Sequence, residues 1–145
     1  MTDGPDPAAV VDYLLTTYPE TDVVEAMHAW FFSLDRERHF PNYATIVTTD
    51  EHDQASDLDR PGVFRLNIGV DKDTFERFVD PAVTPDFTAL DVVLPHPVYA
   101  AQRYLAILNP SATTWRETVI PLLAIAHDRL ATQRSRHDRD DEATS

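Results

Sequence analysis

The chain of 145 residues contains no cysteine, only three glycines and no long apolar run. Without cysteine there are no disulfides, thiol nucleophiles, iron–sulfur clusters or cysteine zinc sites, so any metal site must use His and carboxylates. Gly4, Gly62 and Gly69 are too few and too scattered for a glycine-rich phosphate loop. The sequence also has neither a Gly-x-Ser-x-Gly elbow nor a His-Glu-x-x-His helix. These absences exclude most familiar enzyme classes.

Apolar residues are spread along the chain in short segments. No run of about eighteen apolar residues is present, and the first stretch, "MTDGPDPAAV", lacks the basic and then apolar order of a secretion signal. We therefore expect a cytoplasmic protein without a membrane span. With 43% apolar residues, the chain is large enough to bury one core and to form one domain.

Lysine is almost absent, and the charge is strongly negative. Lys72 is the only lysine, and 25 acidic residues against 12 basic ones give a formal net charge of −13. Such a charge repels polyphosphate backbones, so nucleic acid is an unfavourable partner. Adaptation to high salt and GC-rich coding both produce this composition, and neither identifies an activity.

The order of apolar patterns predicts an α+β two-layer sandwich with an antiparallel sheet of about five or six strands. A first helix is expected from the N-cap Asp6 and Pro7 to Tyr18, and a short middle helix is expected after the N-cap Asp71. The expected strands are "TDVVEA", "AWFFSLD", "YATIVTTD", Val63–Val70, "ALDVVL" and "RYLAILN".

A long last helix is predicted from near Ala112 to about Leu130, with a capping box formed by Thr114 and Glu117 and a bend or a water at Pro121. The remaining stretch, "TQRSRHDRDDEATS", has no large apolar residue. We therefore expect a single domain over residues 1–131 and a disordered charged tail over residues 132–145.

The strand in "DRPGVFRLNIGV" places Arg65, Asn67 and Gly69 on the face opposite its apolar residues. One interpretation is a solvated sheet face, with Arg60 paired to Asp57 or Asp59. The other is a concave polar patch that binds an anion. In that case, residues from the neighbouring strands complete a pocket formed by Arg60, Arg65, Asn67, His96 and Tyr99.

Two weaker groups of residues remain. The acidic loop between Asp50 and Asp59 carries carboxylates suited to a hard cation, but its spacing matches no calcium loop and it lacks the required glycine. His28 and His39 flank a predicted hairpin and are close enough in sequence to approach each other. Neither group leads us to predict a metal site or a cofactor.

The segments "HFPNYATIVTTDEHDQASDLDRPGVFRLNIGV" and "DFTALDVVLPHPVYAAQRYLAILNPS" resemble domain of unknown function 6194, a bacterial and archaeal family. The resemblance extends from Tyr13 to Leu130 and implies no activity and no catalytic residues. The layout is more distantly similar to YjbR/MmcQ-like proteins, which implies a small α+β fold proposed to bind DNA. Here the matching region, "LPHPVYAAQRYL", lacks the basic residues of that family.

The sequence therefore leads first to a non-catalytic binding or interaction module, whose partner is an unidentified small anionic ligand or a protein. The alternative is a small-molecule enzyme in which His96, with Tyr99, transfers protons and Arg60 with Arg65 holds an anion. A YjbR-like DNA-binding protein is the third interpretation, and the net charge of −13 disfavours it. The sequence predicts no oligomeric state.

Overall fold

The computed structural model describes residues 3–34 and 42–144. Its elements, in chain order, are α1 (Pro7–Thr17), β1 (Asp22–Ala26), β2 (Ala29–Ser33), β3 (Ala44–Val47), β4 (Arg65–Gly69), α2 (Lys72–Phe78), β5 (Val93–Pro95), the 3₁₀ helix η1 (Ala100–Gln102), β6 (Tyr104–Leu108), α3 (Ala112–Thr114), the π-helical segment η2 (Trp115–Val119) and α4 (Ile120–Thr144).

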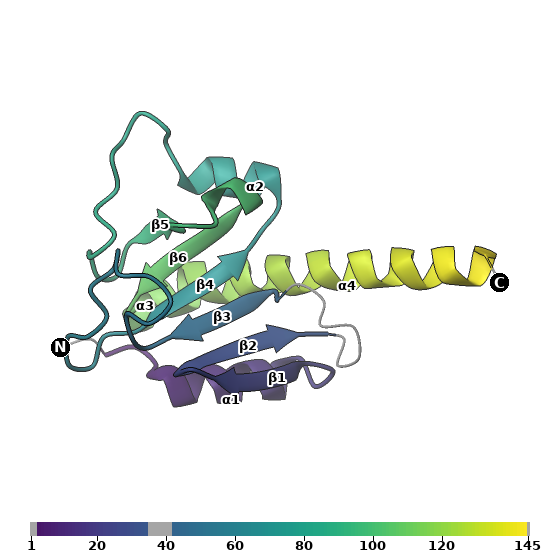
Figure 1. The fold of residues 1–145 in the computed structure, drawn as a ribbon, viewed down its shortest axis with the longest axis horizontal. Helices are drawn as coiled ribbons and strands as arrows, with labels where there is room; N and C mark the ends of the chain where they lie inside the picture. The colour runs from purple at the N-terminus through teal and green to yellow at the C-terminus, as the bar shows by residue number, and fades with distance from the viewer. Residues whose placement is uncertain (1–2, 35–41, 145) are drawn as a thin grey trace.

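The six strands form one antiparallel sheet in the order β1-β2-β3-β4-β6-β5 (Figure 1). β4 lies inside this sheet, between β3 and β6, with Asn67 opposite both Thr45 and Ala106. The predicted α+β architecture, with an N-terminal helix, a short middle helix and a long C-terminal helix, is confirmed.

Helices α1 and α4 cover one face of the sheet (Figure 1). The main core lies between them and that face, because the strands alternate and direct every second residue toward the helices. His127 of α4 also stacks on Tyr18 after α1, with ring centroids 4.0 Å apart, and hydrogen-bonds Glu20. The buried core residues from the strands are Phe32, Ala44, Ile46, Leu66, Ile68, Leu105 and Ile107, and those from the helices are Val10, Leu14, Val119, Leu122, Leu123, Ala126 and Leu130.

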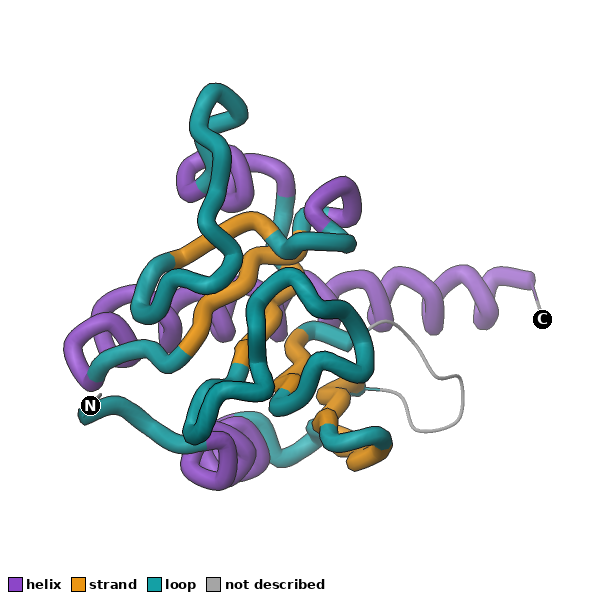
Figure 2. The backbone as a smooth tube through the Cα atoms, turned by 60° about the vertical axis from the view of Figure 1, so that its left-hand side comes forward, coloured by secondary structure: helices purple, strands orange, loops and turns teal. Residues whose placement is uncertain are grey.

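Loops cover the other face of the sheet (Figure 2). In the loop between β3 and β4, residues 48–64, Leu58 is 1% exposed and forms a second small cluster with Ala29, Val47 and Leu108. Asp50 holds the loop in shape by accepting a hydrogen bond from Leu58 N at 2.8 Å. Apolar side chains therefore pack on both faces of the sheet, and the loop between β3 and β4 covers only part of the second face.

The helix caps and ends show which local predictions hold. Asp6 and Asp71 cap α1 and α2 as predicted, each accepting a backbone N–H three residues ahead. The capping box at Thr114 is wrong, because Ser111 caps the helix: its Oγ accepts from Thr114 N at 3.2 Å. The π-helical segment η2 ends two residues before Pro121, so its i→i+5 hydrogen bonds occur in the turn where the proline cannot donate an N–H.

Two element boundaries differ from the prediction. β5 is shorter than "ALDVVL" because Asp91 has a φ of 60°, a left-handed conformation that interrupts a strand. α4 continues to Thr144 instead of ending near Leu130, and no glycine or proline follows Pro121 to stop it. Residues 132–144 are thus helical in the structure, and Figure 1 shows this end of α4 projecting past the sheet. A domain boundary at residue 131 stays a prediction.

Among the described residues, no helix combines the length and the apolar composition needed to cross a bilayer.

The end of α4 provides a test of where the folded core stops. Leu130 is 5% exposed, and none of the side chains described beyond it is buried. Deleting residues 133–145 should therefore change the melting temperature by less than about 2 °C, whereas Leu130→Ala should cost about 2–4 kcal/mol and lower it by several degrees. Thermal denaturation followed by circular dichroism measures both. A drop of several degrees on truncation would show that the projecting part of α4 stabilises the domain.

Candidate functional site

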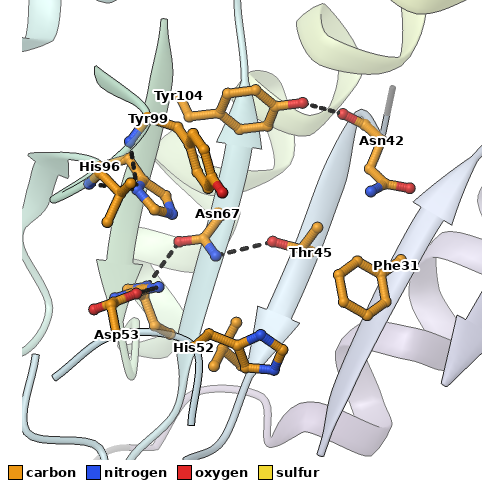
Figure 3. Close-up of a pocket in the computed structure, with 12 residues that line it drawn as sticks. Phe31, Asn42, Thr45, His52, Asp53, Asn67, His96, Tyr99 and Tyr104 are labelled. Atoms are coloured by element: carbon orange, nitrogen blue, oxygen red, sulfur yellow. Dashed lines mark hydrogen bonds and ion pairs between the residues drawn. The ribbon is translucent and has the colours of Figure 1, made fainter. Parts of the chain in front are cut away.

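The described part of the chain contains a cavity of about 370 Å³ on the loop-covered face of the sheet. That volume is near the lower end of the range for small-molecule sites, roughly 300–1,000 Å³. Figure 3 shows Asn67 in the middle, His96 and Tyr99 on one side, and Thr45 and His52 on the other. Twelve residues line the cavity: Phe31, Asn42, Thr45, Val47, His52, Asp53, Arg65, Asn67, His96, Val98, Tyr99 and Tyr104.

Arg65 forms the floor of this cavity and is 1% exposed. Its Nη1 and Nη2 donate to the two carboxylate oxygens of Asp53 at 3.0 and 2.7 Å, and Nη1 also donates to Ser56 Oγ at 2.9 Å. The guanidinium lowers the pKa of the Asp53 carboxyl by hydrogen bonding and by its charge. The interpretation of this sheet face as solvated is therefore wrong, because the loop between β3 and β4 covers it and supplies the counter-ion.

Asn67 is 2% exposed and has a fixed orientation. Because a guanidinium can only donate, the Asn67 oxygen accepts from Arg65 Nε at 2.9 Å, and the amide nitrogen donates to Thr45 Oγ1 at 2.9 Å. The result is a line of polar side chains across β3 and β4, with one amide N–H of Asn67 left for the cavity.

Gly69 makes room for an aromatic side chain. A Cβ on Gly69 would lie 3.0 Å from the ring of Tyr104, its partner across β4 and β6. Tyr104 donates its hydroxyl to Asn42 O at 2.6 Å, so the ring stays over the glycine. The small residue thus defines one end of the cavity.

His96 is 4% exposed and is held by the turn that follows β5. Its Nδ1 lies 3.0 Å from both Val98 N and Tyr99 N. Backbone N–H groups only donate, so Nδ1 is the acceptor and the proton of the neutral ring is on Nε2. Burial, and next the charge of Arg65, lower the pKa of His96 to about 4, with Asp53 opposing. His96 is therefore a neutral hydrogen-bond donor at pH 7.

His52 is a lining residue that sequence reasoning used only as part of the acidic loop. Its Nε2 donates to the carbonyl of Met27 at 3.0 Å, which leaves Nδ1 of the neutral ring as an acceptor. Met27 and His28 form the β1–β2 turn with φ angles of 53° and 60°, and Thr48 Oγ1 donates to His28 O at 2.9 Å. The loop between β3 and β4 therefore also ties down this turn.

The structure brings four of the five predicted site residues to one cavity: Arg65, Asn67, His96 and Tyr99. Arg60 is not among the lining residues. Its Nη2 donates to the carbonyls of Ser56 and Thr88, and its Nε donates to Asp57 O at 2.8 Å and lies 3.6 Å from a carboxylate oxygen of Asp57. The expected pairing of Arg60 with Asp57 is confirmed. Asp53, Thr45 and Phe31 were missed, because only the fold brings them to the same cavity as Arg65.

The two weaker sequence groups yield no site in the described residues. No group of three or more His, Asp or Glu side chains there is arranged to hold a metal ion. In the acidic loop, Asp50 and Asp53 are engaged by Leu58 and Arg65. The proposed approach of His28 to His39 lies outside the described residues, because His39 falls in the gap at 35–41. His28 itself lies 3.2 Å from Glu51.

The sequence model of a family of unknown function, DUF6194, matches residues 5–141, and the chain belongs to that family. No curated protein and no solved structure matches the chain. The more distant similarity to YjbR/MmcQ-like proteins stays a prediction.

The pair of Arg65 and Asp53 predicts a large effect of a small substitution. Asp53→Asn leaves a buried guanidinium without its counter-ion, and we expect unfolding free energy to fall by about 3 kcal/mol or more. Lys72→Gln is the matched control, since the Lys72–Glu76 pair is 4.0 Å long and both side chains are more than 60% exposed. The control should change stability by less than about 0.5 kcal/mol. Urea denaturation measures both, and equal small effects would contradict a buried pair.

The depressed pKa of His96 predicts a loss of stability in acid. The unfolded chain binds the proton below about pH 6.5, whereas the native ring does so only at about pH 4. Stability from this group is therefore full above pH 6.5, falls toward pH 4 and then stays constant, a change of about 1–3 kcal/mol. Arg65, Asp53, Tyr99 and Tyr104 are the titratable groups that face the ring.

His96→Asn tests this pH dependence, because an Asn oxygen can accept the same two backbone N–H groups but does not titrate. The stability gap between wild type and variant should narrow by about 1–3 kcal/mol between pH 7 and pH 4. Denaturation curves at several pH values measure the gap. A difference in stability between wild type and variant that is constant with pH would contradict the lowered pKa of His96.

Proposed function

We propose that this protein is a small-molecule binding domain without catalytic activity, and that its ligand occupies the cavity on the loop-covered face of the sheet. One observation carries the proposal: three buried polar side chains, Arg65, Asn67 and His96, converge on a single cavity. Burial of polar groups is costly and adds little to stability, so a polar cavity of ligand size indicates selection for binding.

The arrangement supports binding more than proton transfer. The basic nitrogen of His96, Nδ1, is engaged by Val98 N and Tyr99 N, so this ring is poorly placed to remove a proton. The Asp53 carboxylate accepts two hydrogen bonds from Arg65, and its lowered pKa makes it a weak base. Both groups fix geometry and charge, which is the usual role of polar residues in a ligand pocket.

Nuclear magnetic resonance with a fragment panel tests the proposal. The panel contains phenol, indole, benzamide, acetate, inorganic phosphate and imidazolium, at pH 7 and fixed ionic strength. We expect at least one fragment to bind with millimolar affinity and to shift the side-chain amide resonances of Asn67 and the ring resonances of His96 and Tyr99. Shifts confined to other parts of the chain, or no saturable shift, would overturn the proposal.

Tyr99→Ala and Val83→Ala form a matched pair for this test. Both side chains are more than half exposed, at 54% and 61%, but only Tyr99 lines the cavity. Tyr99→Ala should weaken fragment binding by about tenfold, or about 1.4 kcal/mol, and Val83→Ala should not change it. Equal effects of the two substitutions would place the binding site elsewhere.

A further inference from the structure

The charges that line the cavity cancel. Arg65 and Asp53 are the only lining residues with a fixed charge, and they form a bidentate pair with each other. His96 is neutral at pH 7, and Arg60, which the sequence analysis grouped with the site, does not line the cavity. An anion or a cation that entered would lose hydration without meeting an unpaired opposite charge, so the cavity disfavours charged ligands.

The two imidazoles of the cavity present opposite hydrogen-bonding groups. His96 is fixed as an Nε2–H donor because backbone N–H groups hold its Nδ1. In the neutral imidazole of His52, donation from Nε2 to the Met27 carbonyl leaves Nδ1 as the acceptor. The assignment of His96 follows from its backbone partners alone, and that of His52 holds for the neutral ring. The cavity therefore has a defined donor side and a defined acceptor side.

Asn67 adds a second donor between these sides. Its amide nitrogen has one N–H on Thr45 Oγ1, and the other is free for a ligand. Figure 3 shows Asn67 between the side with His96 and Tyr99 and the side with Thr45 and His52. The rings of Phe31 and Tyr99 form apolar walls that suit a flat molecule.

We infer that the cavity binds an uncharged, planar amide or lactam, whose carbonyl oxygen accepts from His96 and Asn67 and whose N–H donates to His52. This inference rests on the proposed function and names the ligand class of the same site. The carbonyl and the N–H groups of an amide lie in one plane, so one small group carries both the acceptor and the donor that the two sides of the cavity require. The expectation of an anionic ligand relied on Arg60 and Arg65. Arg60 does not line the cavity, and Arg65 is paired with Asp53.

Four probes of nearly the same shape distinguish a neutral amide ligand from a neutral ketone, an anion and a cation: benzamide, acetophenone, benzoate and benzamidinium. Acetophenone keeps the carbonyl and lacks the N–H, and the last two carry one negative and one positive charge. Titrations followed by nuclear magnetic resonance at pH 7 and fixed ionic strength should give tightest binding for benzamide, about threefold weaker binding for acetophenone and at least tenfold weaker binding for both ions.

Substitutions of His96 and His52 test whether these two side chains cause the preference for benzamide. His96→Asn keeps an acceptor for the backbone and removes the Nε2–H, so benzamide and acetophenone should both bind about tenfold more weakly. His52→Phe keeps a flat ring and removes the acceptor, so the advantage of benzamide over acetophenone should disappear. Amide spectra of both variants must match the folded wild type, and the control Val83→Ala, at an exposed position outside the cavity lining, should bind all probes like wild type.

The failure of this inference is distinguishable from that of the proposed function. If benzoate or benzamidinium binds as tightly as benzamide at the cavity resonances, the amide assignment is wrong and the binding function stands. The same holds if none of the four probes binds while phenol or indole does. If no probe of either panel shifts the cavity resonances, both are overturned.

Discussion

The buried ion pair between Arg65 and Asp53 determines the shape of the loop-covered face. Arg65 comes from an inner strand of the sheet and Asp53 from the loop between β3 and β4, so the pair joins two segments that no backbone ladder connects. Because a buried guanidinium without a counter-ion is costly, the loop must lie against the sheet whenever the domain is folded. Leu58 then completes a small apolar cluster, and the cavity is the part of the face left open.

Hydrogen bonds from this pair fix the orientation of further polar side chains. Arg65 orients Asn67, and Asn67 orients Thr45, so three side chains on two strands have one arrangement. On the opposite side, backbone N–H groups after β5 orient His96. Each of these groups has a fixed hydrogen-bonding role in the protein without ligand, and such preorganisation reduces the entropy lost on binding.

The strands and helix caps were predictable because they depend on local patterns, such as period two in Val63–Val70 or an aspartate before a helix. The solvated interpretation of Arg65 failed because burial there depends on a polar loop with few buried residues, namely Ser56, Leu58 and Phe64. Arg60 and Arg65 are close in sequence, yet the strand carries Arg65 to the cavity while Arg60 folds back onto loop carbonyls. The length of α4 was missed because a polar sequence alone does not end a helix when no glycine or proline is present.

The β1–β2 turn is hydrogen-bonded to His52, which lines the cavity. Met27 and His28 both have positive φ, which costs residues other than glycine about 1 kcal/mol or more each. Hydrogen bonds from Thr48 and His52 to the carbonyls of this turn offset that strain. Movement of the loop between β3 and β4 away from the sheet would therefore break its contacts with the sheet and its hydrogen bonds to the turn together. The position of His52 in the cavity therefore depends on a turn that does not itself line the cavity.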